Sequence, residues 1–250
     1  MLGKLKRYST LSLALVAFFF LTGFIISPLK VDSKAFGKNK TFAIVSIMAT
    51  SKITTNQDSG GFVGLFKGFS KKYSFNEDSS KVFSDSLPLL MKKFQSSKSF
   101  RLLPKNVVIQ NPAYQAMSPD KPKKWFGVQM VPAEGYKYFK DKKKIKELAK
   151  EMNVDGIIVV AVSYSVGFRG ANISGISGVG QDKGTALVSV YAVDNEGNEV
   201  WKHATQGVGK EGVLSTGGPS DFEKLHSSLV EASQIAVQKL IENLDKKVGS

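Results

Sequence analysis

The sequence predicts an α/β protein of the α+β kind, with a mixed sheet of about five strands, a C-terminal antiparallel hairpin and three main helices, one of them long and C-terminal. Three stretches favour this class. Residues 142–152 repeat apolar side chains at helical spacing between lysines. Residues 156–162 follow as an unbroken apolar run, which is typical of a strand covered on both faces. Residues 222–244 carry the broad apolar stripe of a long helix.

The first half of the chain contributes two further strands and a connection. Residues 40–49 have a compact apolar centre and predict the first strand. Residues 100–103 predict the second strand, which ends at a proline. Residues 106–139 contain several prolines among lysines and aromatic side chains, so they predict an irregular connection with short helices.

A helix is expected between these two strands, over residues 79–97. Its apolar side chains recur on one side, but Pro88 lies inside the pattern. The helix either begins near Ser86, with the proline in its first turn, or is longer and irregular at its start. We favour the longer helix.

The last strands form a hairpin. Residues 185–193 and 199–206 flank the sequence DNEGN at 194–198, which has the chemistry of a tight turn. Alternation along the second strand places Val200 and Trp201 on opposite faces. The sequence therefore predicts an antiparallel pair before the final helix.

Residues 167–184 are rich in glycine and join the buried strand to the hairpin. Such a stretch can cradle phosphate through its backbone N–H groups, but its spacing matches no phosphate-binding motif. We favour a flexible or hairpin extension. Beyond the hairpin, Ser220 and Glu223 predict a capping box at the start of the final helix.

The amino end has the layout of an export signal. A cluster of basic residues precedes an apolar run at residues 11–26, and the small residues Ser33 and Ala35 follow at the spacing of a cleavage site. We therefore expect a signal peptide at 1–35 and a single domain at 36–250. The alternative is an uncleaved N-terminal membrane anchor.

The chain contains no cysteine. Its fold therefore has no disulfide, and it lacks the lipid-bearing cysteine of a bacterial lipoprotein. Together with the leader, this predicts an exported protein of the periplasm or one associated with the outer membrane.

The charge is strongly basic and uneven. The formal net charge is +14, and +10 remains beyond residues 1–35, from 30 bases and 20 acids. Residues 36–119 hold twelve bases and four acids, whereas residues 156–250 hold eight and ten. This asymmetry suggests an anionic membrane surface or an acidic protein as partner, although scattered lysines also simply keep a surface solvated. Nucleic acid is not expected, because beyond residue 35 only Arg101 and Arg169 supply forked contacts.

One segment has an unusual composition. Residues 60–75 read GGFVGLFKGFSKKYSF, and at helical spacing the aromatic side chains fall in one stripe with lysines opposite. Each of its glycines costs a helix about 1 kcal/mol, so the segment needs a surface on which to form. That surface is either the core of the protein itself, or a lipid interface or a partner groove.

Candidates for chemistry are few. The histidines are His203, expected to point away from the sheet, and His226, expected beside the packed face of the last helix. Neither has an acid at a ligand-like spacing. Asp194, Glu196 and Glu199 could hold calcium weakly, but such acids more often form the turn itself. We expect no enzyme, no metal and no cofactor.

The order of elements resembles the CsgG-like and TolB amino-terminal-like family of bacterial envelope modules. This resemblance implies an exported protein that binds other envelope proteins or assembles with copies of itself, without catalysis. The chain departs from the family in lacking the lipid-bearing cysteine common in it. The stretches that carry the resemblance are LAKEMNVDGIIVVAVSYS at 148–165, GTALVSVYAVDNEGNEVWKHATQG at 184–207 and SDFEKLHSSLVEASQIAVQKLIENL at 220–244.

These observations lead to competing hypotheses. The first is a non-catalytic cell-envelope protein that serves as an interaction or assembly module, with an envelope partner or a homo-oligomer. The second is a peripheral membrane-binding protein that uses the basic aromatic segment. A weaker third is an enzyme or ligand carrier that uses residues 167–184. The residues expected to make contact are Phe62, Phe66, Phe69, Tyr73, Lys67, Lys71, Lys72, Phe168 and Arg169.

Overall fold

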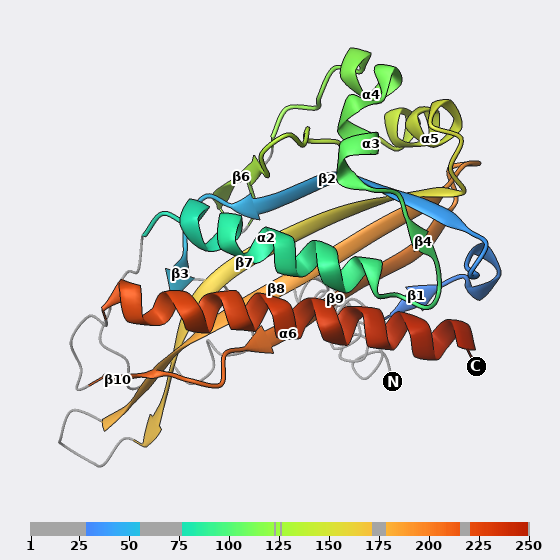
Figure 1. The fold of residues 1–250 in the computed structure, drawn as a ribbon. Coiled ribbons are helices and arrows are strands. Elements are labelled where there is room, and N and C mark those ends of the chain that lie inside the picture. The colour runs from blue at the N-terminus through green and yellow to red at the C-terminus, as the bar shows by residue number, and fades with distance from the viewer. Residues whose placement is uncertain are drawn as a thin grey trace, which may run out of the picture.

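The computed structural model describes residues 29–55, 77–122, 124–125, 127–171, 179–215 and 221–249. Their fold is a mixed sheet with helices on both faces (Figure 1). The strands are β1 (Lys30–Val31), β2 (Thr41–Thr50), β3 (Thr54–Thr55), β4 (Arg101–Leu102), β5 (Lys124–Trp125), β6 (Val128–Pro132), β7 (Gly156–Ala171), β8 (Val179–Asp194), β9 (Glu199–Val208) and β10 (Val213–Ser215). The helices are the 3-10 helix η1 (Ser33–Ala35), α2 (Ser80–Gln95), α3 (Lys105–Gln110), α4 (Pro112–Ala116), α5 (Lys142–Glu151) and α6 (Phe222–Gly249).

The sheet has the order β1-β9-β8-β7-β2-β6-β5. Strands β2 and β7 are parallel, and β7, β8 and β9 follow one another as an antiparallel meander. The apolar runs of the sequence form the two central strands, β2 and β7. Both faces of these strands are covered, so their residues need not alternate between polar and apolar. The mixed sheet, the C-terminal hairpin and the long C-terminal helix are therefore confirmed.

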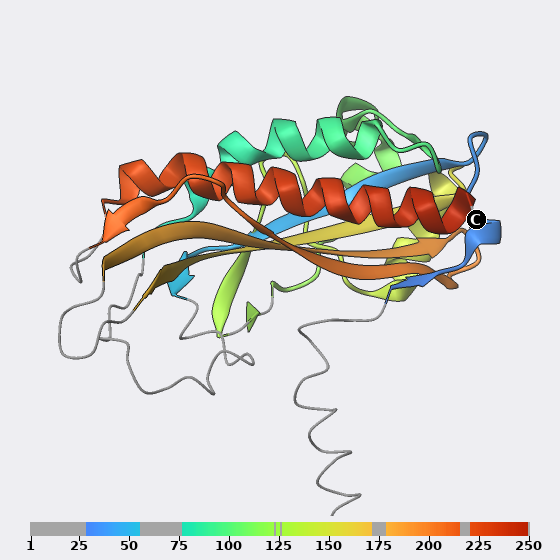
Figure 2. The same ribbon diagram turned by 90° about the horizontal axis from the view of Figure 1, so that it is seen from below.

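Helices α2 and α6 lie together on one face of the sheet, as the view in Figure 2 shows. The largest apolar cluster lies beneath them and includes Trp201, whose ring meets Phe94 of α2 at 6.4 Å between centroids. Pro88 lies within α2, which runs through it as one helix. Both Pro88 and Ser84, whose carbonyl loses its helical N–H, are exposed, so water can replace the missing hydrogen bond. The longer helix is confirmed.

Helix α6 approaches strands β8 and β9 unusually closely at glycines. A Cβ atom added to Gly184 would lie 2.5 Å from the backbone nitrogen of Leu229. A Cβ on Gly207 would overlap the carbonyl oxygen of Ala232. Beside this contact, the Thr205 hydroxyl donates a 2.6 Å hydrogen bond to the carbonyl of Ala236. The helix backbone therefore rests directly on the sheet.

The opposite face is covered at one end by α3, α4 and α5. These helices enclose a second cluster around Tyr114 and Phe139. The Tyr114 hydroxyl donates to the carbonyl of Val45 at 3.1 Å, and burial raises its pKa to about 12. The Lys137 ammonium donates to three carbonyls at the end of α4. These carbonyls would otherwise lack a hydrogen-bond partner, because the last turn of a helix has no N–H groups to offer them. The charge of Lys137 thus has a structural role.

Parts of the sequence prediction were wrong. Residues 128–132 are not irregular but form β6, antiparallel to β2. Val200 and Trp201 do not lie on opposite sides of the core: both belong to the main apolar cluster, because the β8–β9 register shifts between Ala192 and Val193. At the start of α6, the side chain of Asp221 accepts from the N–H of Glu223 at 3.0 Å, while Ser220 lies outside the described residues.

The close contact of α6 generates a stability prediction. We expect Gly207→Ala to lower the free energy of unfolding by at least about 3 kcal/mol, because the new methyl group meets backbone that cannot move aside. Gly249→Ala is the matched control, since nothing lies within 4 Å of that position, and it should change stability by less than about 0.5 kcal/mol. Urea unfolding measures both. Equal effects of the two substitutions would contradict the direct contact.

Two aspartates generate a prediction on pH. Burial acts to raise the pKa of Asp155, but bonds from the N–H of Thr41 at 2.8 Å and from Lys40 at 2.9 Å hold it below its usual value. The pKa of Asp120 is likewise lowered, against burial, chiefly by Lys144 at 2.7 Å. A lowered native pKa stabilises the fold above the unfolded value of about 3.9, and this contribution is lost as the pH falls through the native pKa.

Stability should therefore decline below about pH 4, and Asp155→Asn should make that decline shallower. Urea titrations between pH 7 and pH 2.5 measure it. Parallel curves for the parent and the variant would show that Asp155 does not contribute.

Candidate interaction surface

Strands β7 and β8 form a long two-stranded arm. They pair residue for residue from Gly156 opposite Asp194 to Ala171 opposite Val179. At about 3.3 Å per residue, each strand spans roughly 50 Å. Their outer parts, 165–171 and 179–185, pass beneath α6 at Gly184 and continue past it toward one end of the sheet (Figure 1). We call these outer parts the hairpin arm.

The structure decides between the two interpretations of residues 167–184, a phosphate-binding loop and a flexible or hairpin extension. Residues 167–171 and 179–184 are strand, so the favoured alternative, a hairpin extension, is confirmed. Glycine lowers the intrinsic preference for strand, but pairing with a partner strand supplies the missing stability.

Short strands flank the arm on both sides. Strand β3 pairs in parallel with β7, and Thr55 lies opposite Val166. Strand β10 pairs antiparallel with β8, and Ser215 lies opposite Gly180. Strand β3 therefore widens the sheet at the base of the arm, whereas β10 lies beside β8 farther out along it.

The structure places part of one predicted contact stretch on the arm and the chain on either side of the other stretch near its base. Phe168 and Arg169 lie on β7 opposite Asp182 and Gln181, although their side chains are outside the described residues. The aromatic and lysine residues predicted at 62–73 also lie outside them. The chain leaves for this segment from β3 and returns beside it, since the N–H of Ile53 donates to the carbonyl of Glu77 at 2.9 Å. The segment therefore starts and ends at the base of the arm.

A hollow of about 410 Å³ lies between β10 and the first turns of α6. Leu214 lines it and is 73% exposed, which makes it the most exposed large apolar side chain among the described residues. Sequence reasoning missed this residue. Its only signal was a single leucine in a short polar stretch before Pro219. The hollow is lined by Glu211, Gly212, Val213, Leu214, Lys224 and Ser227.

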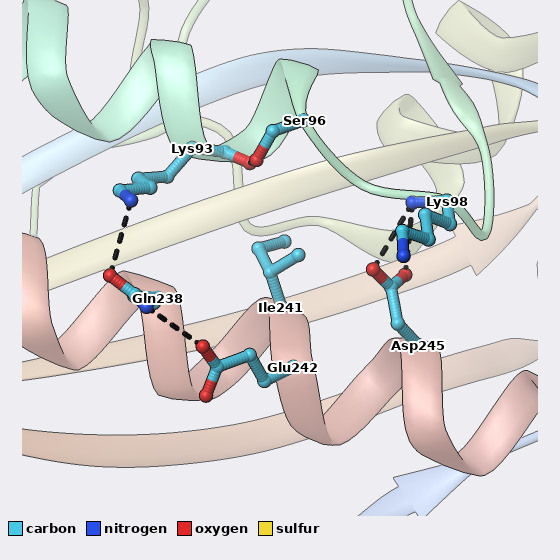
Figure 3. A pocket seen from close by; sticks show the side chains of 7 residues that line it. All are labelled: Lys93, Ser96, Lys98, Gln238, Ile241, Glu242 and Asp245. Carbon is cyan, nitrogen blue, oxygen red and sulfur yellow. Dashed lines mark hydrogen bonds between the residues drawn. The ribbon is translucent and has the colours of Figure 1, made fainter.

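A second hollow, of about 320 Å³, lies between the end of α2 and α6 (Figure 3). Its polar side chains bond to one another across the two helices. Lys93 donates to Gln238 at 3.1 Å, and Gln238 donates to Glu242 at 2.8 Å. The Asp245 carboxylate accepts from the N–H of Lys98 at 3.1 Å through both oxygens. It also accepts from the hydroxyls of Ser97 and Ser99 at 2.9 and 2.6 Å.

These contacts fasten the turn after α2 to the last helix. The Asp245 carboxylate faces several N–H and O–H donors at once, which is the environment of a structural acceptor. The hollow of Figure 3 is therefore best interpreted as a helix-to-helix clamp.

The histidines also have structural partners. His203 points away from the sheet, as predicted, and is buried beneath α6, with its Nε2 3.0 Å from the amide nitrogen of Asn243. His226 lies 3.1 Å from the carboxylate of Asp85 on α2. Sequence spacing could not reveal this pair, because the two residues belong to different helices.

The acidic residues of the hairpin turn also have hydrogen-bond or ion-pair partners. Asp194 accepts from the N–H groups of Glu196 and Asn198 at 2.9 and 2.8 Å, and Glu199 pairs with Lys30 at 2.9 Å. The turn-forming interpretation of these acids is confirmed. In the part of the chain that the structure describes, no group of three or more acidic or histidine side chains is arranged to hold a metal ion.

Buried hydroxyls lie between the helices and the sheet. Tyr164 is fully buried, and burial raises its pKa, so it is neutral. Near it, the hydroxyls of Ser86 and Ser233 donate to carbonyls of their own helices. These groups contribute to packing.

Within the described ranges, no helix combines the length and the apolar character needed to cross a membrane.

The class defined by these features is an α+β domain with a mixed sheet and a protruding hairpin arm. No family model matches the chain, and no curated protein matches it. It is similar to a hypothetical protein, CT253, from Chlamydia trachomatis, with 8% identity and a TM-score of 0.35 over 84% of this chain and 98% of that one. It is also similar to lipoprotein GNA1162 from Neisseria meningitidis, with 14% identity and a TM-score of 0.31 over 82% and 99%.

Likenesses at these scores establish neither a family nor a function for this chain. The resemblance to the CsgG-like and TolB amino-terminal-like family therefore stays a prediction.

The clamp of Figure 3 can be tested by substitution. We expect Asp245→Ala to lower the free energy of unfolding by about 1.5–3 kcal/mol, because charge-assisted bonds to three neighbouring residues are lost. Glu242→Ala, in the same hollow, removes a single exposed bond and should cost less than about 0.5 kcal/mol. Denaturant unfolding compares the two. A cost at Glu242 equal to that at Asp245 would contradict the clamp.

Proposed function

We propose that the protein is an exported, non-catalytic component of the cell envelope that binds another envelope protein, or further copies of itself, through the hairpin arm. One observation carries this proposal: the chain leaves for residues 60–75 from β3 and returns beside it at Glu77, and β3 pairs with β7 at the base of the arm that residues 167–171 and 179–184 form. Some ninety residues separate them in the chain.

The arm suits a contact with a macromolecule. It reaches beyond the helix layer, and Leu214 is exposed beside its outer part, opposite Gln181. Strand β3 is only two residues long, so β7 has no described neighbour on its outer side from residue 167 to residue 171, whereas β8 is paired with β10 at residues 180–182. Strand edges of this kind are used for recognition by strand addition.

The polar groups that sequence reasoning singled out support a non-catalytic role. His203, His226 and Asp194 each lie within bonding distance of a neighbouring side chain or backbone group. An active site needs converging groups that can reach a substrate, whereas these three are spread over separate elements.

Export is supported by the amino end, where basic residues precede an apolar run. The periplasm or the outer membrane is the proposed location, and the absence of cysteine argues against a lipid anchor of the lipoprotein type.

The test uses the full chain with a photoreactive amino acid at position 168, and separately at position 150 on helix α5. We expect cross-links to an envelope protein or to a second copy from position 168, but not from exposed Lys150 at the far end of the fold. Phe168→Asp with Arg169→Glu should weaken the captured complex at least tenfold, or about 1.4 kcal/mol. Lys150→Glu should leave its affinity unchanged.

A strictly monomeric protein without cross-links from the arm would overturn the proposal. Co-sedimentation with anionic vesicles separates the membrane-binding alternative. If Phe66→Asp with Phe69→Asp abolishes vesicle binding and no protein contact is found, the segment 60–75 is a lipid contact instead.

A further inference from the structure

The folded domain begins before the expected cleavage site. Strand β1 pairs antiparallel with β9, with Lys30 opposite Lys202 and Val31 opposite Trp201. The N–H of Asp32 continues this ladder by donating to the carbonyl of Val200 at 2.9 Å. Residues 30–32 are therefore an edge of the sheet.

The next residues join the core. The Asp32 carboxylate accepts from the N–H of Lys34 at 3.1 Å and so begins η1. Leu29, Val31 and Ala35 pack against the main apolar cluster.

Phe36 lies deep in that cluster. Its ring stacks on Phe42 with 5.0 Å between centroids and meets Trp201 edge-on at 6.3 Å. The bond between Ala35 and Phe36 thus joins two packed residues.

Cleavage after Ala35 conflicts with this packing. It would remove β1 and η1, and it would leave a new ammonium group on Phe36, which is 7% exposed among aromatic rings. A charge in such surroundings is costly to desolvate. The small residues at 33 and 35, which resemble a cleavage signal, have a structural role in η1 instead.

We infer that the chain is not cut at Ala35, and that the apolar run 11–26 stays attached as an N-terminal anchor in a lipid bilayer. Between Arg7 and Lys30 the sequence has no charged side chain. This uncharged stretch is longer than the roughly 20 residues that a membrane-spanning segment needs. From residue 18 to residue 29, no two small residues stand at the spacing of a cleavage site.

The basic residues at 4, 6 and 7 place the amino end on the cytoplasmic side, so the domain lies on the other side of that membrane. This inference rests on the export in the proposed function, but not on the hairpin arm.

The strand register shows that the proposed anchor and the hairpin arm attach to the sheet at different places. Lys30 lies in one row with Lys202, Tyr191 and Val159. From Val159 the strand continues for twelve residues to Ala171 at the end of the arm, a distance of about 40 Å. The lipid attachment and the proposed protein contact are therefore at different places on the sheet.

The test is the intact mass of the full chain recovered from its own membranes, together with extraction by alkaline carbonate. We expect the uncut mass of 27.2 kDa, apart from loss of the initiator methionine, and a protein that stays with the membrane. A chain that begins at Phe36, or at any residue between 18 and 36, would overturn the inference.

Two variants make this test more specific. Ser33→Lys alters an exposed residue of the apparent signal, and we expect neither the mass nor the extraction to change. Leu21→Ala with Gly23→Ala introduces small residues at the cleavage spacing and should release a shortened soluble chain, which shows that cutting is detectable. A change caused by Ser33→Lys would contradict retention of the anchor.

Phe168→Asp with Arg169→Glu separates this inference from the proposed function. That variant should remain membrane-bound and uncut even where it loses its partner. Loss of membrane attachment in it would contradict an anchor at the amino end.

Discussion

The fold depends on direct contact between the backbone of helix α6 and strands β8 and β9. At Gly184 and Gly207 no side chain could fit between helix and sheet. The hydroxyl of Thr205 adds a hydrogen bond to the helix carbonyl of Ala236. Such close packing excludes water over a long, narrow strip, and the same helix also presses Trp201 against the rest of the core. Strands β8 and β9 are thereby held in one register along the helix.

The hairpin arm is a consequence of that register. Because β8 is held by α6 at Gly184, its preceding residues are directed outward and pair with the end of β7. The flanking strands β3 and β10 then attach to the arm, β3 at its base beside Val166 and β10 farther out beside Gln181. The core thus presents a projecting pair of strands at one end and begins, at β1, at another place on the sheet.

Sequence reasoning succeeded where the signal is local. The helix at 142–151, the strand that follows it and the final helix each carry their own periodicity, so no distant partner is needed to recognise them. Strand β6 was missed because it is five residues long, ends in Pro132 and is paired to β2 across some eighty residues of sequence. The burial of Val200 beside Trp201 depends on a register shift that alternation alone does not show.

The candidate surface was predictable only in part. Its residues were identified from composition, but the parallel pairing of β3 with β7, at the point where the chain leaves for residues 60–75, has no sequence signature. Hydrogen exchange of the full chain tests most directly that the arm is a preformed part of the sheet. The account predicts that amides at 165–171 and 179–185 exchange far more slowly than an unfolded chain, in step with those at 157–162. Exchange in the arm at the rate of unpaired backbone would contradict it.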